Sequence, residues 1–332
     1  MNIKSLLAAL PLAAIGVLAP PHVALAQTVK VDGSSTVFPI TEAVAEEFQI
    51  SKRGKVRVTV GIAGTGGGFK RFCRGETDIS NASRPILKAE MAECAKAGIK
   101  YIEVPVAYDA LTVVVNPQAN WVDQITVAEL QKMWEPAAQG KISRWNQVNP
   151  KWPNAPLKLF GPGSDSGTFD YFTEAVMHKA KSSRGDFTAS EDDNVLVQGV
   201  TQDQNALAYF GYAYYAANAG KMKALKIINS NGLPVSPSDV TVLDGSYNPL
   251  SRPIFIYVNL DSLKKAEVKE FVSFYLANAA GLVKEVKYVP LSAASYKLAQ
   301  EHVNKLKVGT VFGGESKVGL KVEDLLKMEA TL

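Results

Sequence analysis

Three short segments of the sequence carry residue types that can bind an anion: residues 32–39, 61–69 and 161–169. Each is rich in glycine and in Ser or Thr, follows an apolar run typical of a strand, and precedes a predicted helix. Small residues let the backbone approach a ligand, hydroxyl groups donate hydrogen bonds, and free N–H groups at a helix start carry partial positive charge. One such segment is most simply a capped helix start, but three in one chain favour a site for a small oxyanion.

Other interpretations of these segments fail at particular residues. A nucleotide-binding P-loop requires Lys and then Ser or Thr after its last glycine, whereas Gly68 is followed by Phe69 and Lys70. The dinucleotide pattern Gly-x-Gly-x-x-Gly fails as well, because Phe69 stands at its last position. A serine nucleophile within residues 164–167 would need a general base, and no histidine lies in a recognisable setting for one. We therefore expect anion binding without catalysis.

One acidic residue bears on which anion is bound. Asp78 begins a predicted strand at 78–81, and we expect it at the sheet edge that carries the second glycine-rich segment. A carboxylate repels an anion unless the anion donates a proton to it, which phosphate does near neutral pH and sulfate does not. Asp78 therefore predicts selection of phosphate over sulfate. A cap at the end of a strand is the alternative interpretation.

The first 26 residues have the pattern of a cleavable export signal. Lys4 precedes an apolar run at 6–18, and Ala24-Leu25-Ala26 fits a cleavage site. The run is too short to span a bilayer, and the segment contains no cysteine to which a lipid anchor could be attached. We expect the mature chain to diffuse freely in the periplasm.

Composition excludes several classes of protein. The chain has 332 residues, 47% of them hydrophobic, which is enough for two domains with packed cores. Its 36 basic and 32 acidic residues nearly balance, and no basic run interleaved with aromatic residues indicates a nucleic-acid partner. His178 and His302 lie far apart without ligand spacing, so we expect no metal and no cofactor. Cys73 and Cys94 both follow the export signal and predict a disulfide in an oxidising compartment.

The spacing of apolar residues predicts the strands and helices. Strands and helices alternate through the first third, as in parallel α/β folds. Strands are predicted at 29–31, 55–60, 78–81, 101–105, 111–115 and 253–258, and residues 209–215 are predicted as a buried strand and its turn. Helices are predicted at 41–48, 67–74, 88–97, 127–134, 168–179, 262–277, 295–306 and 322–328. We expect two lobes, with the chain crossing between them near 106–116 and 249–256.

The order of several motifs resembles that of PstS-type phosphate-binding proteins, the periplasmic component of ABC phosphate importers. The motifs are Asp-Gly-Ser-Ser-Thr-Val at 32–37, Gly-Thr-Gly-Gly-Gly at 64–68, Asp78 with Ser83-Arg84-Pro85, Asp-Ser-Gly-Thr at 165–168, Asp-Asp-Asn-Val at 192–195, and Arg252-Pro253. The resemblance implies a type II periplasmic-binding-protein fold, in which two α/β lobes joined by two hinge segments hold the ligand in a cleft. We expect residues 27–110 and 252–332 in lobe I and residues 111–251 in lobe II.

The resemblance also implies a function. The protein would be a monomer that binds inorganic phosphate with high affinity and delivers it to a membrane permease for import, without catalysis. Binding of another oxyanion (sulfate, molybdate or tungstate) and an exported phosphatase are the alternatives. A phosphatase would need a metal or a nucleophile with a base.

By position, the resemblance assigns the phosphate ligands to Ser35, Thr36, Val37, Thr65, Asp78, Arg84, Ser166, Gly167 and Thr168. Many members of the family have an arginine four residues before the serine at 166, where this chain has Pro162. Arg84 is the nearest other cation in a matching motif. We therefore expect Arg84 to neutralise the anion's charge.

Overall fold

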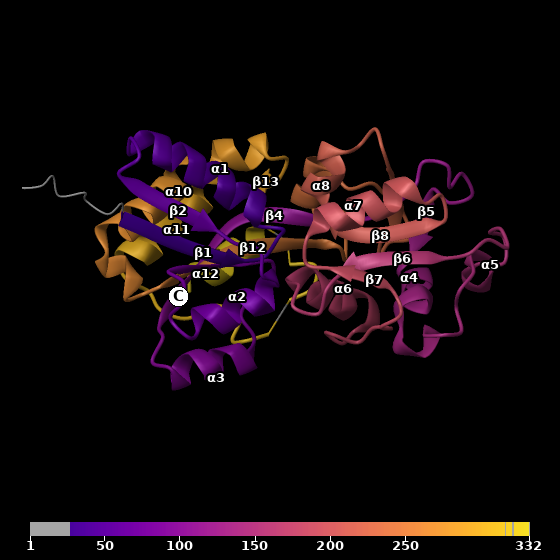
Figure 1. Cartoon of the computed structure of the whole chain (residues 1–332), viewed down its shortest axis with the longest axis horizontal. Helices are drawn as coiled ribbons and strands as arrows, with labels where there is room; N and C mark the ends of the chain where they lie inside the picture. The colour runs from indigo at the N-terminus through magenta and orange to yellow at the C-terminus, as the bar shows by residue number, and fades with distance from the viewer. Residues whose placement is uncertain (1–26, 316, 321, 332) are drawn as a thin grey trace, which may run out of the picture.

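The structure is a computed structural model that describes residues 27–315, 317–320 and 322–331, so the predicted export signal lies outside the described residues. The chain forms two halves that lie side by side (Figure 1). We name them by the expected boundaries, lobe I for residues 27–110 and 252–331 and lobe II for residues 111–251. No helix in the described part of the chain is long and apolar enough to cross a membrane.

Lobe I is built on three parallel strands: β1 (Gln27–Gly33), β2 (Val56–Val60) and β3 (Ile79–Ala82). Strand β1 lies in the middle and pairs with both neighbours. Because the strands are parallel, the segments that follow them leave the sheet at the same edge. The first and second glycine-rich segments are therefore brought together by the sheet, as expected.

Helices cover both faces of the lobe I sheet. In Figure 1, α1 and α10 lie above β1 and β2, whereas α2 and α3 lie below. On the upper side the ring of Phe48 packs 5.3 Å from that of Phe271. The helices and short elements of this lobe are α1 (Phe38–Ser51), α2 (Gly64–Phe72), α3 (Lys88–Lys96), η2 (Ser262–Lys264), α10 (Ala266–Glu285), β13 (Val289–Pro290), α11 (Ala293–Asn304) and α12 (Val322–Glu329). The helix predicted at 262–277 in fact begins at Ala266 and runs to Glu285.

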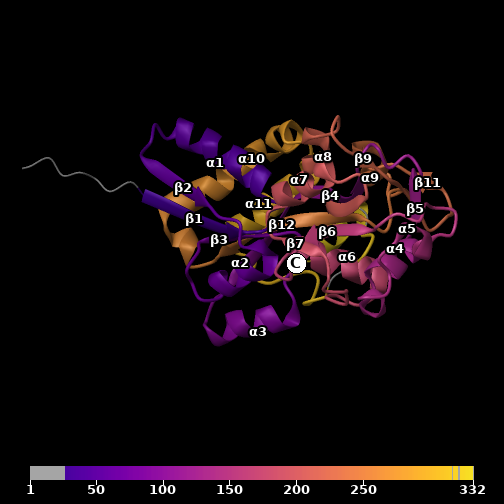
Figure 2. The same cartoon turned by 45° about the vertical axis from the view of Figure 1, so that its right-hand side comes forward.

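Two long strands connect the lobes: β4 (Tyr101–Val115) and β12 (Ser251–Asn259). Both are fully buried and antiparallel, and both run between the lobes in Figure 1 and Figure 2. The prediction of separate strands at 101–105 and 111–115 is wrong, because β4 continues through the interval. A register shift opposite Ile254 and Phe255 accommodates Pro105, which lacks the N–H that a regular ladder needs.

Lobe II continues the same sheet from β4. The strand order across the molecule is β2-β1-β3-β12-β4-β8-β6-β7. The strands of lobe II are β8 (Ala206–Gly211), β6 (Lys158–Pro162), β7 (Thr188–Ser190) and β9 (Lys223–Ala224), with a second small sheet of β5 (Gln124–Thr126), β10 (Lys226–Ile228) and β11 (Pro234–Val235). Its helices are α4 (Val127–Trp134), η1 (Pro136–Ala138), α5 (Trp145–Val148), α6 (Gly167–Met177), α7 (Asp193–Gln202), α8 (Tyr212–Ala217) and α9 (Asp239–Leu243).

An aromatic cluster forms the core of lobe II. The rings of Phe172 and Tyr209 stack 3.7 Å apart, and Trp134 meets Tyr209 edge to face. Residues 209–215, predicted as a buried strand and its turn, are a strand only to Gly211, and the rest of the segment belongs to helix α8, which begins at Tyr212. A run of aromatic residues has no period that separates a strand from a buried helix, so the sequence could not place this boundary.

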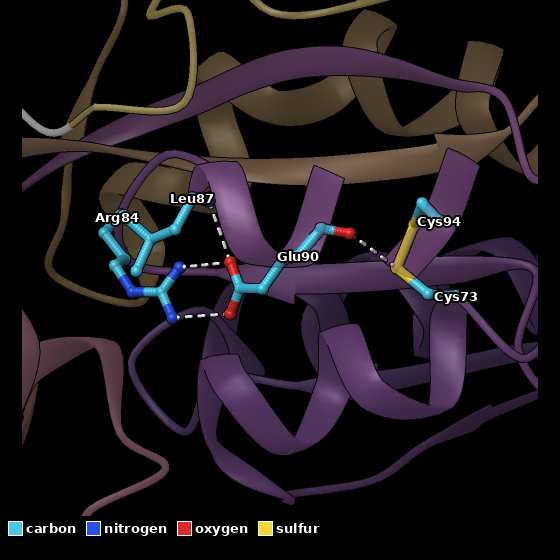
Figure 3. The surroundings of a disulfide bond; sticks show 5 residues. All are labelled: Cys73, Arg84, Leu87, Glu90 and Cys94. Carbon is cyan, nitrogen blue, oxygen red and sulfur yellow. Dashed lines mark hydrogen bonds and ion pairs between the residues drawn. A yellow bond between two sulfur atoms is a disulfide. The ribbon is translucent and has the colours of Figure 1, made fainter. Parts of the chain in front are cut away.

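The predicted disulfide is present in the structure. Cys73, at the end of α2, is bonded to Cys94, near the end of α3 (Figure 3). The two residues are 21 positions apart, and their Cα atoms are separated by 4.3 Å. The bond therefore joins the ends of two helices on the same side of the lobe I sheet.

Candidate functional site

The first and third glycine-rich segments meet between the lobes. Thr36 lies just before α1 in lobe I, and Thr168 lies in the first turn of α6 in lobe II. Their hydroxyl oxygens are 3.0 Å apart, and both side chains are buried. Ser166 caps α6, because its hydroxyl accepts a hydrogen bond from the Thr168 N–H at 3.1 Å. Hydroxyl groups from both lobes and the N-terminus of α6 thus converge on one point.

The second segment contacts the third from the other side. A Cβ atom on Gly167 would lie 2.5 Å from Thr65 Oγ1 and 2.6 Å from Ser83 Oγ, so only glycine allows this approach. Thr65 Oγ1 also accepts a hydrogen bond from the Ser83 N–H at 3.1 Å. Helix α2 begins at Gly64, three residues before the predicted start at 67, which places Thr65 in its first turn. In Figure 1 and Figure 2, α2 and α6 face each other across the boundary between the lobes.

Ser35 and Val37 flank Thr36 at the same place. The Ser35 hydroxyl lies 3.4 Å from Asp193 Oδ2, a carboxylate of lobe II. Val37 is the residue that precedes the first turn of α1, so its backbone lies at the positive end of that helix. The structure therefore brings together seven of the nine predicted ligands: Ser35, Thr36, Val37, Thr65, Ser166, Gly167 and Thr168.

The cation at this meeting point is Arg252. Its Nη1 donates to the Gly167 carbonyl oxygen at 3.0 Å, and its Nη2 donates to Thr168 Oγ1 at 2.7 Å. Asp109 Oδ2, on the neighbouring strand, accepts from Nη2 at 3.2 Å. Arg252-Pro253 is one of the sequence motifs described above, but the motif alone predicts no role for the arginine. An arginine in a strand that is otherwise apolar is the signal that could have found it, because an arginine is rarely buried without a partner.

Arg84 does not occupy the position predicted for it. Its Nε donates to Asp170 Oδ2 at 2.7 Å, and its two terminal nitrogens donate to the carboxylate of Glu90 at 2.8 and 2.7 Å. Nη1 donates also to the Pro85 carbonyl oxygen at 3.1 Å. Two carboxylates thus already neutralise this guanidinium, so the contacts do not agree with a role in neutralising a bound anion.

Asp78 lies at the wrong end of its strand for the predicted role. It precedes β3, and β3 runs parallel to β1, so Asp78 lies beside Lys30, about 10 Å before the edge at which Gly33 meets Asn81. Its carboxylate accepts from the Lys30 N–H, from Ser262 Oγ at 2.7 Å and from Lys265 Nζ at 2.8 Å. The expectation of a shared sheet edge is wrong. Asp78 precedes its strand and lies at one edge of the parallel sheet, whereas the glycine-rich segments follow their strands and lie at the opposite edge.

Two other carboxyl groups lie at the meeting point. Asp109 and Asp193 are both buried, and each has a side-chain oxygen without a hydrogen-bond partner among the described residues: Oδ1 in both cases. Burial, together with the nearby charge of Asp109, raises the pKa of Asp193 to about 7, although Arg252 opposes the shift. Burial also raises the pKa of Asp109, against the effect of Arg252. A carboxyl group with a pKa near neutrality can exchange a proton with a bound ligand.

All of these groups are shielded from solvent by the two lobes. Thr36, Thr168, Arg252 and Asp193 are each no more than 1% exposed. An anion in solution can reach them only when the lobes separate. The arrangement therefore fits a binding protein that opens and closes around its ligand.

Comparison with known proteins identifies the class. The family model described as a PBP superfamily domain matches residues 19–279. Protein SphX of Synechococcus elongatus is 57% identical over 324 residues, which cover 96% of this chain and 95% of that protein. The phosphate-binding protein PstS of Staphylococcus saprophyticus is 39% identical over 292 residues, covering 87% and 86% of the two chains. The chain belongs to the PBP superfamily and, within it, to the family of SphX and the PstS phosphate-binding proteins.

Solved structures agree with this assignment. A possible phosphate binding protein from Planctomyces limnophilus is 49% identical, with a TM-score of 0.63 over 85% of this chain and 99% of that one. A candidate phosphate ABC transporter substrate-binding protein from Clostridium perfringens, with bound phosphate, is 26% identical, with a TM-score of 0.67 over 80% and 100%. The predicted fold class, a type II periplasmic-binding-protein fold of two α/β lobes, is confirmed.

Proposed function

We propose that this protein binds inorganic phosphate between its lobes and delivers it to the permease of an ABC importer. The observation that carries the proposal is the buried convergence of Thr36, Thr168, Arg252 and the N-terminus of α6. Hydroxyl groups, a guanidinium and free N–H groups at a helix start are the donors that a phosphate oxygen requires. The names of the relatives described above support phosphate as the ligand.

The proposed ligands are the seven predicted residues that converge, together with Arg252 in place of Arg84. The hydroxyl groups of Thr36 and Thr168 lie within hydrogen-bond distance of each other, and they exchange this bond for bonds to phosphate oxygens when the anion enters. Arg252 already contacts Thr168 and stays anchored by Asp109. The guanidinium then needs no reorientation to meet the anion.

We propose that Asp193, in place of Asp78, accepts a hydrogen bond from the O–H group of the bound phosphate. It lies at the first turn of α7, next to Ser35, and its Oδ1 atom has no partner among the described residues. A hydrogen bond from a phosphate O–H to this oxygen would satisfy it. Sulfate has no proton to donate at neutral pH and would instead meet a partly charged carboxylate.

The remaining features of the proposal concern the whole chain. Residues 1–26 direct export to the periplasm and are removed, and the mature chain acts as a monomer. The lobes divide at 110/111 and 251/252, and β4 and β12 act as the hinge. The strand pairings support this division, because residues 111–115 of β4 pair with β8 of lobe II whereas residues 101–110 pair with β12.

Calorimetric titration of the mature chain with phosphate and with sulfate tests the proposal. We expect one phosphate bound per chain, with a dissociation constant of about 1 μM or lower, which corresponds to about −8 kcal/mol. Sulfate at millimolar concentration should give no saturable heat. Equal binding of both anions, or no binding of phosphate, would contradict the proposal.

A further inference from the structure

A buried ion cluster outside the proposed anion site spans the two lobes. Its centre is Arg84 of lobe I, whose side chain is 2% exposed. One partner, Glu90, belongs to the same lobe and accepts two hydrogen bonds from the guanidinium. The other partner, Asp170, belongs to lobe II and is equally buried, with its Oδ2 atom 2.7 Å from Arg84 Nε. One positive charge is therefore shared between carboxylates of both lobes.

The lobe II partner lies on the helix that presents the anion site. Asp170 is in the first turn of α6, two positions after Thr168. Lys181 is the other cation near it, but its Nζ is 3.8 Å from Asp170 Oδ1 and its side chain is half exposed. The ion pair between Arg84 and Asp170 thus holds the N-terminus of α6, which carries Gly167 and Thr168, against lobe I.

The lobe I partner is held rigidly. Glu90 Oε2 accepts a hydrogen bond from the Leu87 N–H at 2.9 Å, and the Glu90 carbonyl oxygen lies 3.5 Å from Cys73 Sγ (Figure 3). The disulfide between Cys73 and Cys94 fastens α3, which carries Glu90, to α2. Helix α2 in turn carries Thr65 in its first turn. Glu90, which binds the Arg84 guanidinium, and Thr65, which belongs to the lobe I side of the anion site, therefore lie on two helices that the disulfide joins.

We infer that Arg84 is a closure latch: its ion pair with Asp170 holds the two lobes together around the ligand without contacting it. This inference rests on the proposed phosphate-binding function and assigns to Arg84 a positioning role in it. The ion pair forms only when the lobes meet, since its two members lie on different lobes. Its contribution is thus absent while the anion first encounters an open lobe and present once the protein has closed.

A latch of this kind has a kinetic signature that differs from that of a ligand. Loss of a contact that forms only after closure accelerates release and does not slow association. Loss of Arg252, by contrast, removes direct contacts to the anion. Selectivity among anions should not depend on the latch, because Asp170 and Arg84 are engaged with each other and with Glu90.

Stopped-flow measurement of phosphate binding and release by Asp170→Asn tests the inference. Asparagine keeps an acceptor oxygen for Arg84 Nε but removes the charge across the lobes. We expect release at least about tenfold faster and association no slower than in the parent, because interface substitutions act chiefly on release. Glu90→Gln, which loosens the same guanidinium within lobe I, should accelerate release by a smaller factor.

Glu174→Gln is the matched control, since it removes the same charge one turn further along α6. Its carboxylate forms no ion pair within the described ranges of the chain. Release from this variant should match the parent. Equal release rates for Asp170→Asn and Glu174→Gln, with both variants folded by circular dichroism, would overturn the latch.

A measurement without anion separates this inference from the function on which it rests. Small-angle scattering of the unliganded proteins should give a larger radius of gyration for Asp170→Asn than for Glu174→Gln, because the latch favours the closed form. If the parent fails to bind phosphate, the proposed function is wrong, and the scattering comparison still decides the latch. Equal radii for the two variants would overturn it.

Discussion

The guanidinium of Arg252 and the carboxylate of Asp109 lie 3.2 Å apart on the two strands that connect the lobes, with 1% and 0% of their side chains exposed. The two residues are direct partners in the antiparallel ladder between β12 and β4. Asp109 thereby fixes the orientation of Arg252, whose other N–H groups reach Gly167 and Thr168 of lobe II. The cation of the proposed anion site thus lies on one of the two strands that connect the lobes.

Replacement of Arg252 should therefore abolish tight binding. Arg252→Gln is expected to weaken phosphate affinity at least about 100-fold, because truncation of a buried charged partner costs about 2–5 kcal/mol or more. Arg252→Lys should recover little, since one ammonium group cannot serve Gly167, Thr168 and Asp109 together. Titration calorimetry measures both affinities.

The matched control for this prediction is Arg184→Gln. Arg184 is also a buried arginine, paired with Asp186 at 2.5 Å, but it lies in lobe II and donates to the carbonyl oxygens of Met133 and Ile142. Its loss should lower the melting temperature and leave phosphate affinity within about threefold of the parent, since none of these partners is a residue of the meeting point. Equal losses of affinity in the two variants would mean that Arg252 acts only through stability.

Gly167→Ala should prevent complete closure. The added methyl group would meet Thr65 Oγ1 and Ser83 Oγ, which belong to the other lobe. Overpacking of this kind costs about 1–3 kcal/mol, so phosphate affinity should fall about ten- to 100-fold. Stability against urea should change little, because the clash lies between lobes and disappears when they open.

Gly281→Ala serves as the control for the glycine substitution. Gly281 lies inside α10, and a Cβ atom there would meet nothing within 4 Å. Alanine in a helix interior should add up to about 1 kcal/mol of stability and leave binding unchanged. If Gly167→Ala binds phosphate as well as Gly281→Ala does, then α6 does not close onto α2 as tightly as the structure shows.

The stability of the unliganded protein should fall as pH rises from about 4 to 7. Burial raises the pKa of Asp193 to about 7, so in this range the folded chain holds a proton that the unfolded chain has lost. Glu103, whose pKa burial raises to about 8, acts in the same direction. The stabilisation is thus complete at low pH and is lost as pH approaches the folded-state pKa.

Urea unfolding at several pH values measures the share of Asp193 in this dependence. The slope that one such group contributes is at most about 1.4 kcal/mol per pH unit. Asp193→Asn should flatten the slope between pH 5 and 7 relative to the parent, whereas Glu103→Gln should flatten it also above pH 7. An unchanged slope in Asp193→Asn would mean that this carboxyl group titrates normally.

Much of the fold follows from local patterns in the sequence. Strands at 55–60 and 253–258 and the helix at 127–134 have clear apolar periodicity and lie where expected. The errors fall where the local signal is misleading. Pro105 predicts the end of a strand, but β4 continues past this residue because it pairs with β12 on both sides of it. Such tertiary pairing is not visible in a local window.

The candidate site, like the fold, can be predicted from the sequence where local patterns determine it and cannot be predicted where it depends on contacts between distant segments. The three glycine-rich segments meet because each follows a parallel strand, which the sequence indicates. The sequence does not predict the role of Arg252, because its partner Asp109 on β4 and its partners Gly167 and Thr168 on α6 are all distant in sequence. The role predicted for Arg84 disagrees with its contacts for a related reason, since its partner Asp170 comes from the other lobe. Contacts between distant segments depend on topology rather than on motif.

Substitution of Asp78 tests whether this residue takes part in the discrimination between phosphate and sulfate. Its carboxylate is bound by Ser262, Lys265 and the Lys30 N–H, away from the meeting point of the lobes. Asp78→Asn should therefore leave the discrimination between phosphate and sulfate unchanged. It should lower stability by about 1 kcal/mol, because Lys265 is half exposed and such ion pairs contribute little.

Asp193→Asn should behave in the opposite way. An amide can donate a hydrogen bond to an unprotonated oxygen, so the variant should bind sulfate measurably and phosphate more weakly than the parent. Competition titrations of both variants with the two anions at pH 7.5 separate the roles, because each variant removes one carboxylate charge from a buried side chain. If Asp78→Asn binds sulfate and Asp193→Asn still rejects it, then Asp78 is the residue that discriminates between the two anions. The anion site would then lie nearer to Asp78 than we propose.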